Sequence, residues 1–232
     1  MRTHSTRLVV GAGLLSVALT ACSSGSGPGP ASGSPATAAA RSGPVPQTSA
    51  AKEKGIPGGA LLQPDDVRGV RGEPLDQGES AHVRPLRPCG DGRYPSDESR
   101  TDAVAMRYVV PGPEGSTPTV VIEFVGLHTP GGAAAQLRDI DAALDRCPGG
   151  LGEGQRKWTV LESDDASALV RIDQRISYAD EEPSTVSHFA AVATVNDAVV
   201  VVTDLGWENM GGDESLVREL IAKAKQRAGT IA

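Results

Sequence analysis

The sequence predicts an α+β domain in which an antiparallel sheet of about six strands has its helices packed on one face. Two observations lead to this fold class. Between residues 104 and 205, six short runs alternate apolar and polar side chains or are apolar throughout, as strands are, and short turns join several of them. Two other stretches repeat apolar residues three and four apart, as helices do, and are segregated from the hairpins.

The first predicted element is a short helix at Pro64. Proline fits the first helical turn, and Asp65 and Asp66 complement the positive end of the helix. Gly69 is expected to end it. The polar stretch that follows is rich in glycine and proline, so we expect a loop there, and this loop holds Cys89.

A hairpin and a helix come next. Apolar side chains alternate over residues 104–110 and 120–124, and the Pro-Gly-Pro-Glu-Gly sequence between the two runs predicts a turn. From Ala133 to Cys147 the apolar residues are spaced by three and four, which predicts a helix. Cys147 would then lie on the buried stripe of that helix.

Four more strands and a last helix complete the predicted domain. The strands cover residues 158–161, 168–178, 186–195 and 198–205. Asn196 and Asp197 form a plausible two-residue turn between the last two strands. Residues 199–202 are apolar on both faces, which indicates a central strand covered on both sides or lying well inside the sheet. The helix spans residues 213–228, with an apolar stripe and basic side chains near its negative end.

The first 21 residues have the build of a bacterial export signal. Arg2 and Arg7 precede an apolar run over residues 8–19. This run is too short to cross roughly 30 Å of hydrocarbon as a permanent helix. We therefore expect the segment to be cleaved.

The end of this signal resembles the bacterial lipobox. Leu19, Thr20 and Ala21 supply an aliphatic and two small residues directly before Cys22. We expect cleavage after Ala21 and acylation of Cys22, which would anchor the protein to the outer face of the cytoplasmic membrane, because more than one acyl chain gives stable attachment. The alternative is an ordinary export signal with a chance cysteine.

A tether and one globular domain follow. Residues 22–55 are almost all small or polar and contain no aromatic side chain, so this stretch cannot bury enough apolar surface to offset the entropy of ordering. Residues 56–232 have a length that suits a single domain. We expect the domain to be held away from the membrane on a flexible chain.

Charge narrows the range of partners. Cleavage would remove two arginines and no acidic residue, leaving 20 basic against 29 acidic residues and a net charge of −9. Nucleic acid and anionic membrane surfaces are therefore disfavoured as partners of the domain. The excess of arginine over lysine and the abundance of alanine, glycine and proline indicate a GC-rich genome, such as that of an actinobacterium.

The cysteines predict a disulfide. If Cys22 carries lipid, Cys89 and Cys147 remain as a pair in an exported protein, where disulfides form and persist. Two free thiols are the alternative. No Cys-x-x-Cys occurs and the histidines are scattered, so we expect neither a zinc site nor another cofactor.

Short motifs resemble a known group of proteins. They are Leu-Leu-Gln-Pro-Asp at residues 61–65, Cys-Gly followed by Tyr-Pro-Ser-Asp within 89–97, and Gly-Gly-Ala-Ala at 131–134, which leads into the helix ending at Cys147. In these the chain is similar to small actinobacterial sensor-domain lipoproteins and to the extracellular domain of certain mycobacterial Ser/Thr receptor kinases. The resemblance covers roughly residues 56–230.

This resemblance implies an α+β domain with a cleft, held by disulfide bonding, and a ligand-sensing rather than catalytic role. The chain departs from the kinases in having one possible disulfide where they carry two, and in having no kinase domain or membrane-spanning helix. Any signalling would therefore need a partner protein. No ligand-binding residue can be transferred from the resemblance.

No catalytic constellation is expected. Ser187, His188 and Asp204 have the residue types of a hydrolytic triad, but adjacent residues of a strand point to opposite faces. No nucleophile elbow, phosphate-binding loop or dinucleotide fingerprint occurs. His128 and His188 are expected to be hydrogen-bonded structural residues, with metal binding or acid–base chemistry as the alternative. We predict that the chain is not an enzyme.

Four side chains are candidates for ligand binding. Trp207 follows the last strand, where it would either line the mouth of a cleft or cap the core. Arg107, Arg171 and Arg175 would share an open sheet face that receives an anionic ligand. The alternative is a solvated face on which these arginines pair with Asp173.

Three functions are compatible with these features. The first is a membrane-anchored, non-catalytic ligand-binding or sensor-like domain whose partners are a small envelope ligand or a signalling protein. The second is a structural or protein-interaction module of the cell envelope, and the third is an envelope hydrolase. An apolar pocket with a few converging polar groups would favour the first over the second. A buried titratable pair in such a pocket would favour the third.

Overall fold

The computed structural model describes residues 55–231, apart from residues 91, 115, 153–154 and 178–181. The expected export signal with its lipobox, the expected lipidation at Cys22, and the expected tether up to residue 54 lie outside the described residues. In the part of the chain that is described, no helix is both long and apolar enough to cross a membrane.

A single antiparallel sheet of seven strands forms the centre of the domain, which confirms the α+β class. Its strand order is β1-β2-β3-β7-β6-β5-β4. The strands are β1 (Glu73–Pro74), β2 (Arg100–Val110), β3 (Thr119–His128), β4 (Arg156–Asp164), β5 (Ser167–Ile176), β6 (Ser184–Val195) and β7 (Ala198–Asp204). The added strand is the two-residue β1, which lies in the stretch expected to be a loop and pairs with β2 at the sheet edge.

The two α-helices lie where the apolar spacing predicts them, whereas the 3-10 helices η1 (Gly58–Ala60) and η3 (Pro95–Ser99) were not predicted. A further 3-10 helix is η2 (Pro64–Asp66), and the α-helices are α1 (Gly132–Arg146) and α2 (Glu214–Ala228). Asp213 caps α2 by accepting hydrogen bonds from the backbone N–H groups of Ser215 and Leu216. The short helix expected at Pro64 is present as the 3-10 helix η2.

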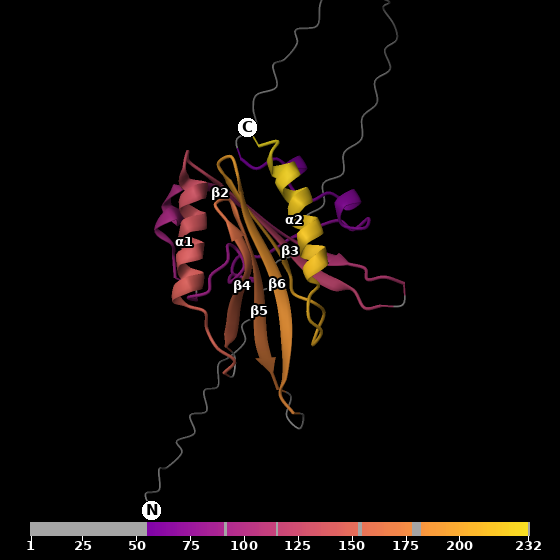
Figure 1. Cartoon of the computed structure of the whole chain (residues 1–232). Coiled ribbons are helices and arrows are strands. Elements are labelled where there is room, and N and C mark those ends of the chain that lie inside the picture. The colour runs from indigo at the N-terminus through magenta and orange to yellow at the C-terminus, as the bar shows by residue number, and fades with distance from the viewer. Residues whose placement is uncertain (1–54, 91, 115, 153–154, 178–181, 232) are drawn as a thin grey trace, which may run out of the picture. The chain divides into compact units, whose positions relative to one another are not determined.

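The two α-helices cover opposite faces of the sheet, so the expectation of helices on one face was wrong (Figure 1). The central strand β7 is buried along its whole length. Val199 and Val201 belong to the core under α1, whereas Val200 and Val202 belong to the core under α2. Because alternate side chains of a strand point to opposite faces, a strand that is apolar on both sides needs a cover on each. We call the two sides the α1 face and the α2 face.

The predicted disulfide is present and fastens part of the α1 face. Cys89 and Cys147 are joined, with their Cα atoms 5.2 Å apart. Cys147 is the half-buried C-cap of α1 and does not lie on its buried stripe, because the helix ends one residue earlier. The loop that carries Cys89 contributes Val83 and Leu86 to the core under α1. The bond therefore ties this loop to the end of the helix that it packs beside.

Candidate functional site

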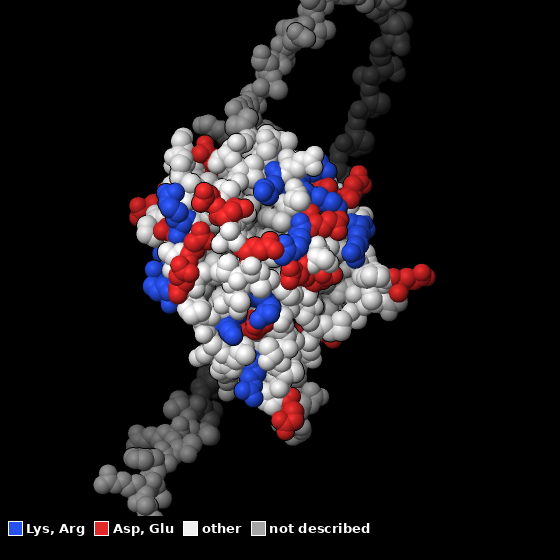
Figure 2. Space-filling view, viewed as in Figure 1, with Lys and Arg blue, Asp and Glu red and all other residues white. Residues whose placement is uncertain are grey.

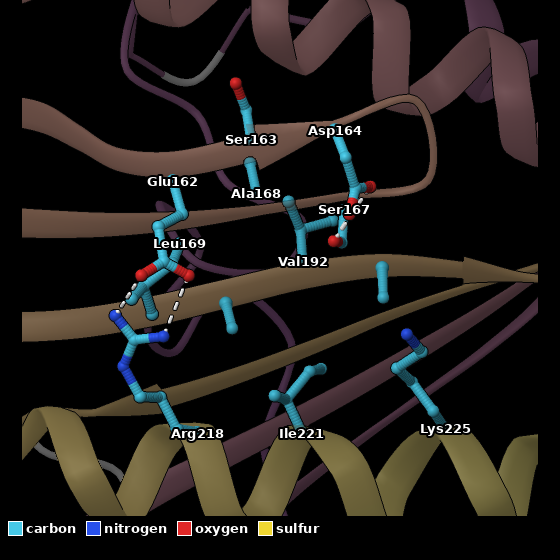
Figure 3. A pocket seen from close by; sticks show the side chains of 12 residues that line it. Glu162, Ser163, Asp164, Ser167, Ala168, Leu169, Val192, Arg218, Ile221 and Lys225 are labelled. Carbon is cyan, nitrogen blue, oxygen red and sulfur yellow. Dashed lines mark hydrogen bonds and ion pairs between the residues drawn. The ribbon is translucent and has the colours of Figure 1, made fainter.

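A groove opens on the α2 face, between α2 and the β4–β5 hairpin (Figure 3). It has a volume of about 330 Å³. We call it the α2 groove and define it by Glu162 and Asp164 of β4, Leu169 of β5, Ala191 and Ala193 of β6, and Arg218, Ile221 and Lys225 of α2. Figure 3 shows the three α2 side chains rising toward the strands.

The groove exists because α2 packs against β6 and β7, not against the outer strands of the sheet. The floor consists of Leu169 together with Ala191 and Ala193, and all three are at least nine-tenths buried. Alanine side chains are too short to fill the space between the sheet and Ile221. The floor is therefore apolar and hollow, which suits the body of a small apolar ligand.

A β-bulge directs one acidic side chain toward α2. The register between β4 and β5 shifts between Val160 and Glu162, so Leu161 is the extra residue. After the shift, Glu162 lies opposite Leu169, whose side chain belongs to the groove floor. A bulge re-aims the side chains that follow it, and here it brings a carboxylate to the groove rim.

An ion pair closes one end of the groove. Arg218 donates from Nη1 to Oε2 of Glu162 at 2.8 Å and from Nη2 to Oε1 at 2.7 Å, a bidentate arrangement. Arg218 also donates to Glu214 on its own helix at 2.9 Å. The hydrogen bonds from Arg218 hold the pKa of Glu162 below its ordinary value. Two carboxylates therefore surround one cation at this end of the groove, so Arg218 is fully paired and the end carries a net negative charge.

The other end holds a cation with fewer partners. Asp164 accepts hydrogen bonds from the Ala166 N–H at 2.8 Å and from Ser167 Oγ at 3.0 Å, and the backbone hydrogen bond is the main cause that lowers its pKa. Lys225 adds a weaker electrostatic contribution to the same shift. Among the described residues, Lys225 makes no ion pair within 4 Å. Lys225 is therefore the basic group at the groove that is available to an anionic ligand.

The three arginines expected to share a sheet face do not share one. Arg107 on β2 lies opposite Ile122 of the core under α1, and it pairs with Glu73 at 2.9 Å and Glu79 at 3.3 Å. Arg171 and Arg175 lie on β5, which three strands separate from β2, and their side of that strand belongs to the α2 face. The expected arginine surface is therefore not formed, because it depended on a strand order that local patterns do not reveal.

The alternative of a solvated face on which the arginines pair with Asp173 is confirmed for the pairing with Arg171 and wrong for the exposure of Asp173. This carboxylate is 6% exposed. It accepts a hydrogen bond from Ser187 Oγ at 2.7 Å and pairs with Arg171 Nε at 3.1 Å. Asp173 is buried because β6 pairs along its full length with β5 and brings Ser187 beside it.

Trp207 lies outside the α2 groove. It is half-buried and lines a smaller hollow of about 180 Å³ at the start of α2, beside Asp213 and Leu216. Met210 lies opposite Trp207 in an isolated bridge and is 49% exposed. Trp207 therefore lines the edge of a hollow, and its role in ligand binding stays a prediction.

Within the described part of the chain, the residues weighed for catalysis are not joined by hydrogen bonds. Ser187 donates to Asp173, and Asp204 accepts from Thr119 Oγ1 and from the backbone of Gly206 and Asp213. Burial lowers the pKa of His188 more than the charge of Asp204 raises it. Among the described residues, no group of three His, Cys, Asp or Glu side chains could hold a metal ion.

His128 has a structural environment. Its side chain is 4% exposed, and its Nδ1 lies 2.9 Å from Ser99 Oγ. A Cβ built on Gly132 would lie 2.9 Å from the Cβ of His128, so only glycine leaves room at this start of α1. The close packing accounts for the burial of the imidazole, and burial is the main cause that lowers its pKa.

A buried titratable pair, Glu123 and Tyr108, was missed in the sequence. Glu123 is fully buried on β3, and Tyr108 donates to its Oε2 at 2.7 Å. The available signal was the lone charged residue in the otherwise apolar run of β3. Both carboxylate oxygens are occupied by Tyr108 and the backbone of Leu62, so the pair offers no exposed atom to a substrate.

The surface charge is mixed. On the face shown in Figure 2, acidic and basic side chains are interspersed, and no broad patch of one sign is present. A basic surface that follows a nucleic-acid backbone would have a single sign. The view therefore agrees with the negative net charge of the chain in giving no nucleic-acid surface on this face.

The described residues thus define an antiparallel α+β domain with a groove whose floor is apolar and whose rim is polar and charged. No family model and no curated protein matches the sequence. The structure is similar to the crystal structure of the extracellular domain of PknH from Mycobacterium tuberculosis, with 15% sequence identity and a TM-score of 0.46, covering 72% of this chain and 93% of that chain. A similarity at this level transfers neither a ligand nor a residue role, so the function has to be inferred from this chain's own side chains.

Proposed function

We propose that the chain is an extracytoplasmic lipoprotein, anchored through Cys22, whose domain binds a small ligand in the α2 groove without catalysing a reaction. The lipobox-like sequence before Cys22 supports the anchor. The groove supports binding, because an apolar floor with a few converging polar groups is the usual composition of a ligand site. In the cell, this binding would serve a sensor-like role, with a signalling protein as the partner of the domain.

The single observation that carries the binding proposal is the contrast between the two ends of the groove. Arg218 is neutralised by Glu162, whereas Lys225 makes no close ion pair among the described residues. Ile221 lies between the two ends, and Leu169 lies beside Glu162 at the Arg218 end. This arrangement fits a ligand with an apolar body and an anionic end, the latter placed at Lys225.

The test is the melting temperature of the full chain, measured against a panel of envelope fragments, lipids and small acidic metabolites. Ligand binding to the native state stabilises it by mass action. We expect an upward shift with amphipathic anions. Ala191→Leu fills the groove and Lys225→Ala removes the free cation, so each should abolish the shift.

The matched control is Ala222→Leu, which adds the same atoms to the exposed side of α2 and should leave the shift intact. A shift that survives in both Ala191→Leu and Lys225→Ala would place the ligand elsewhere, and a panel without any shift would favour a protein-interaction module. The anchor is tested separately by labelling cells with a palmitate analogue, and incorporation that persists in Cys22→Ser would contradict it.

A further inference from the structure

The segment that precedes the sheet packs on the α2 face, and the buried carboxylate of Glu123 is one of the groups that hold it there. Ala60, Leu61 and Leu62 are buried in the same core as α2. The N–H of Leu62 donates to both oxygens of Glu123, at 3.1 and 3.0 Å. The hydroxyl of Tyr108 donates to Glu123 at 2.7 Å and also lies 3.2 Å from the Leu62 carbonyl oxygen. Glu123 therefore joins β3, β2 and the N-terminal segment at one point.

Among the described residues, no cation balances this carboxylate. Glu123 is 0% exposed, and no basic group contributes to its electrostatic environment. The titratable groups that face it are Tyr108 from β2, whose hydrogen bond lowers the pKa of Glu123, and Asp66 from η2, whose negative charge raises it. Burying an ionised carboxylate without a counter-ion costs much free energy, whereas burying a neutral carboxyl that keeps its hydrogen bonds costs much less.

The other elements packed around Glu123 bring apolar groups or cations that are engaged elsewhere. β7 places Val202 opposite Glu123. α2 contributes apolar side chains to the surrounding core, while its two nearby cations reach Asp66: Arg227 Nε lies 2.9 Å from Asp66 Oδ2, and Lys223 Nζ lies 3.0 Å from its carbonyl oxygen. Within the described part of the chain, the neighbouring elements thus offer Glu123 hydrogen bonds but no counter-ion.

We propose that Glu123 is a proton-operated latch: protonated, it holds residues 55–62 against the α2 face, and ionised, it loosens them, while Arg227 and Lys223 keep Asp66 in place. Burial is the main cause that raises the pKa of Glu123 to about 7, while the hydrogen bonds from Tyr108 and Leu62 lower it. The docked segment favours the protonated form, so docking is most stable below the ordinary pKa of the carboxyl, near 4.5. It weakens as the pH rises through about 7.

The latch acts where the domain meets the preceding chain. Release of residues 55–62 would lengthen the connection by up to about 25 Å if these residues became fully extended. A lower pH would therefore hold the domain closer to the point where its chain is attached. Only this last step depends on the proposed lipid anchor, because the latch itself does not involve Cys22 or the α2 groove.

The test is amide hydrogen exchange of the full chain at pH 5.5 and pH 8, corrected for the intrinsic pH dependence of exchange. A carboxyl that titrates near 4.5 when hydrated and near 7 when docked raises the opening equilibrium about 30-fold over this range. We expect the Leu62 amide to lose protection by about this factor. The amides of Val200 and Val201 in β7 serve as the core reference and should change much less.

Two variants make the test decisive. Glu123→Gln keeps the shape and an acceptor for the Leu62 N–H but does not titrate, so the pH-dependent loss of protection should disappear. Tyr108→Phe removes a hydrogen bond that lowers the pKa of Glu123, so the loss should move to higher pH. Protection of Leu62 that is independent of pH in the native chain, or equally pH-dependent in Glu123→Gln, would overturn the latch without bearing on ligand binding.

Discussion

At the scale of single residues, buried carboxylates organise the irregular parts of the chain. Asp204 is fully buried at the end of β7 and accepts three hydrogen bonds. They come from Thr119 Oγ1, from the N–H of Gly206 at 2.8 Å and from the N–H of Asp213 at 2.9 Å. Asp213 in turn caps α2. One side chain therefore ties the start of β3, the loop after β7 and the start of α2 together.

We predict that Asp204→Ala lowers the free energy of unfolding by about 3 kcal/mol, because it leaves buried donors without an acceptor. Urea unfolding followed by circular dichroism measures the change. Asp145→Ala, at an exposed position of α1, is the matched control and should stay within about 0.5 kcal/mol of the native chain. Equal effects of the two substitutions would show that Asp204 does not organise this junction.

Residue roles were predictable only where a local pattern reveals them. The cysteine count was enough to pair Cys89 with Cys147. The fate of Asp173 was not predictable from its strand, because its burial depends on Ser187 from the neighbouring strand. Glu123 was missed for a similar reason, since its partners lie on β2 and in the N-terminal segment.

At the scale of elements, the disulfide compensates for a long irregular stretch. Its two cysteines are 58 residues apart, and they close a loop that contains η3, β2, β3 and α1. Arg87 adds a second fastening by pairing with Asp97 at 2.9 Å. The irregular segment before β2 has few helix or strand hydrogen bonds of its own, so the disulfide and the Arg87–Asp97 ion pair stabilise it.

We predict that the double substitution Cys89→Ala and Cys147→Ala lowers the free energy of unfolding by about 4 kcal/mol, the chain-entropy value for a loop of this length. Urea unfolding of the native chain with and without reductant should give the same difference. Cys22→Ala is the control and should not alter the midpoint. An unfolding midpoint that reductant leaves unchanged would refute the prediction.

The sequence predicts elements better than it predicts their arrangement. Strands β5, β6 and β7 are found close to their expected bounds, because the two-residue alternation and the Asn196–Asp197 turn are local signals. The face that each helix covers is a non-local property, and it was wrong for the pair α1 and α2. The α2 groove was equally hidden, because it depends on the bulge at Leu161 and on where α2 lies across the sheet.

At the scale of the whole molecule, the sheet divides the interior into two cores that share β7. Trp158 belongs to the core under α1, whereas Trp207 lies beside the start of α2. Alternate side chains of the same strand enter both cores. Loss of packing on one face therefore disturbs the strand on which the other face is built, and we expect both faces to unfold in one transition.

Substitutions in each core test this cooperativity. Leu137 under α1 and Leu220 under α2 are almost fully buried, so replacing either by alanine should lower the free energy of unfolding by about 3 kcal/mol. Trp158→Phe and Trp207→Phe each leave one tryptophan, whose fluorescence reports on one face. We predict that Leu220→Ala shifts the urea midpoint of both reporters equally. A shift confined to the Trp207 signal would mean that the two faces unfold separately and that β7 does not couple them.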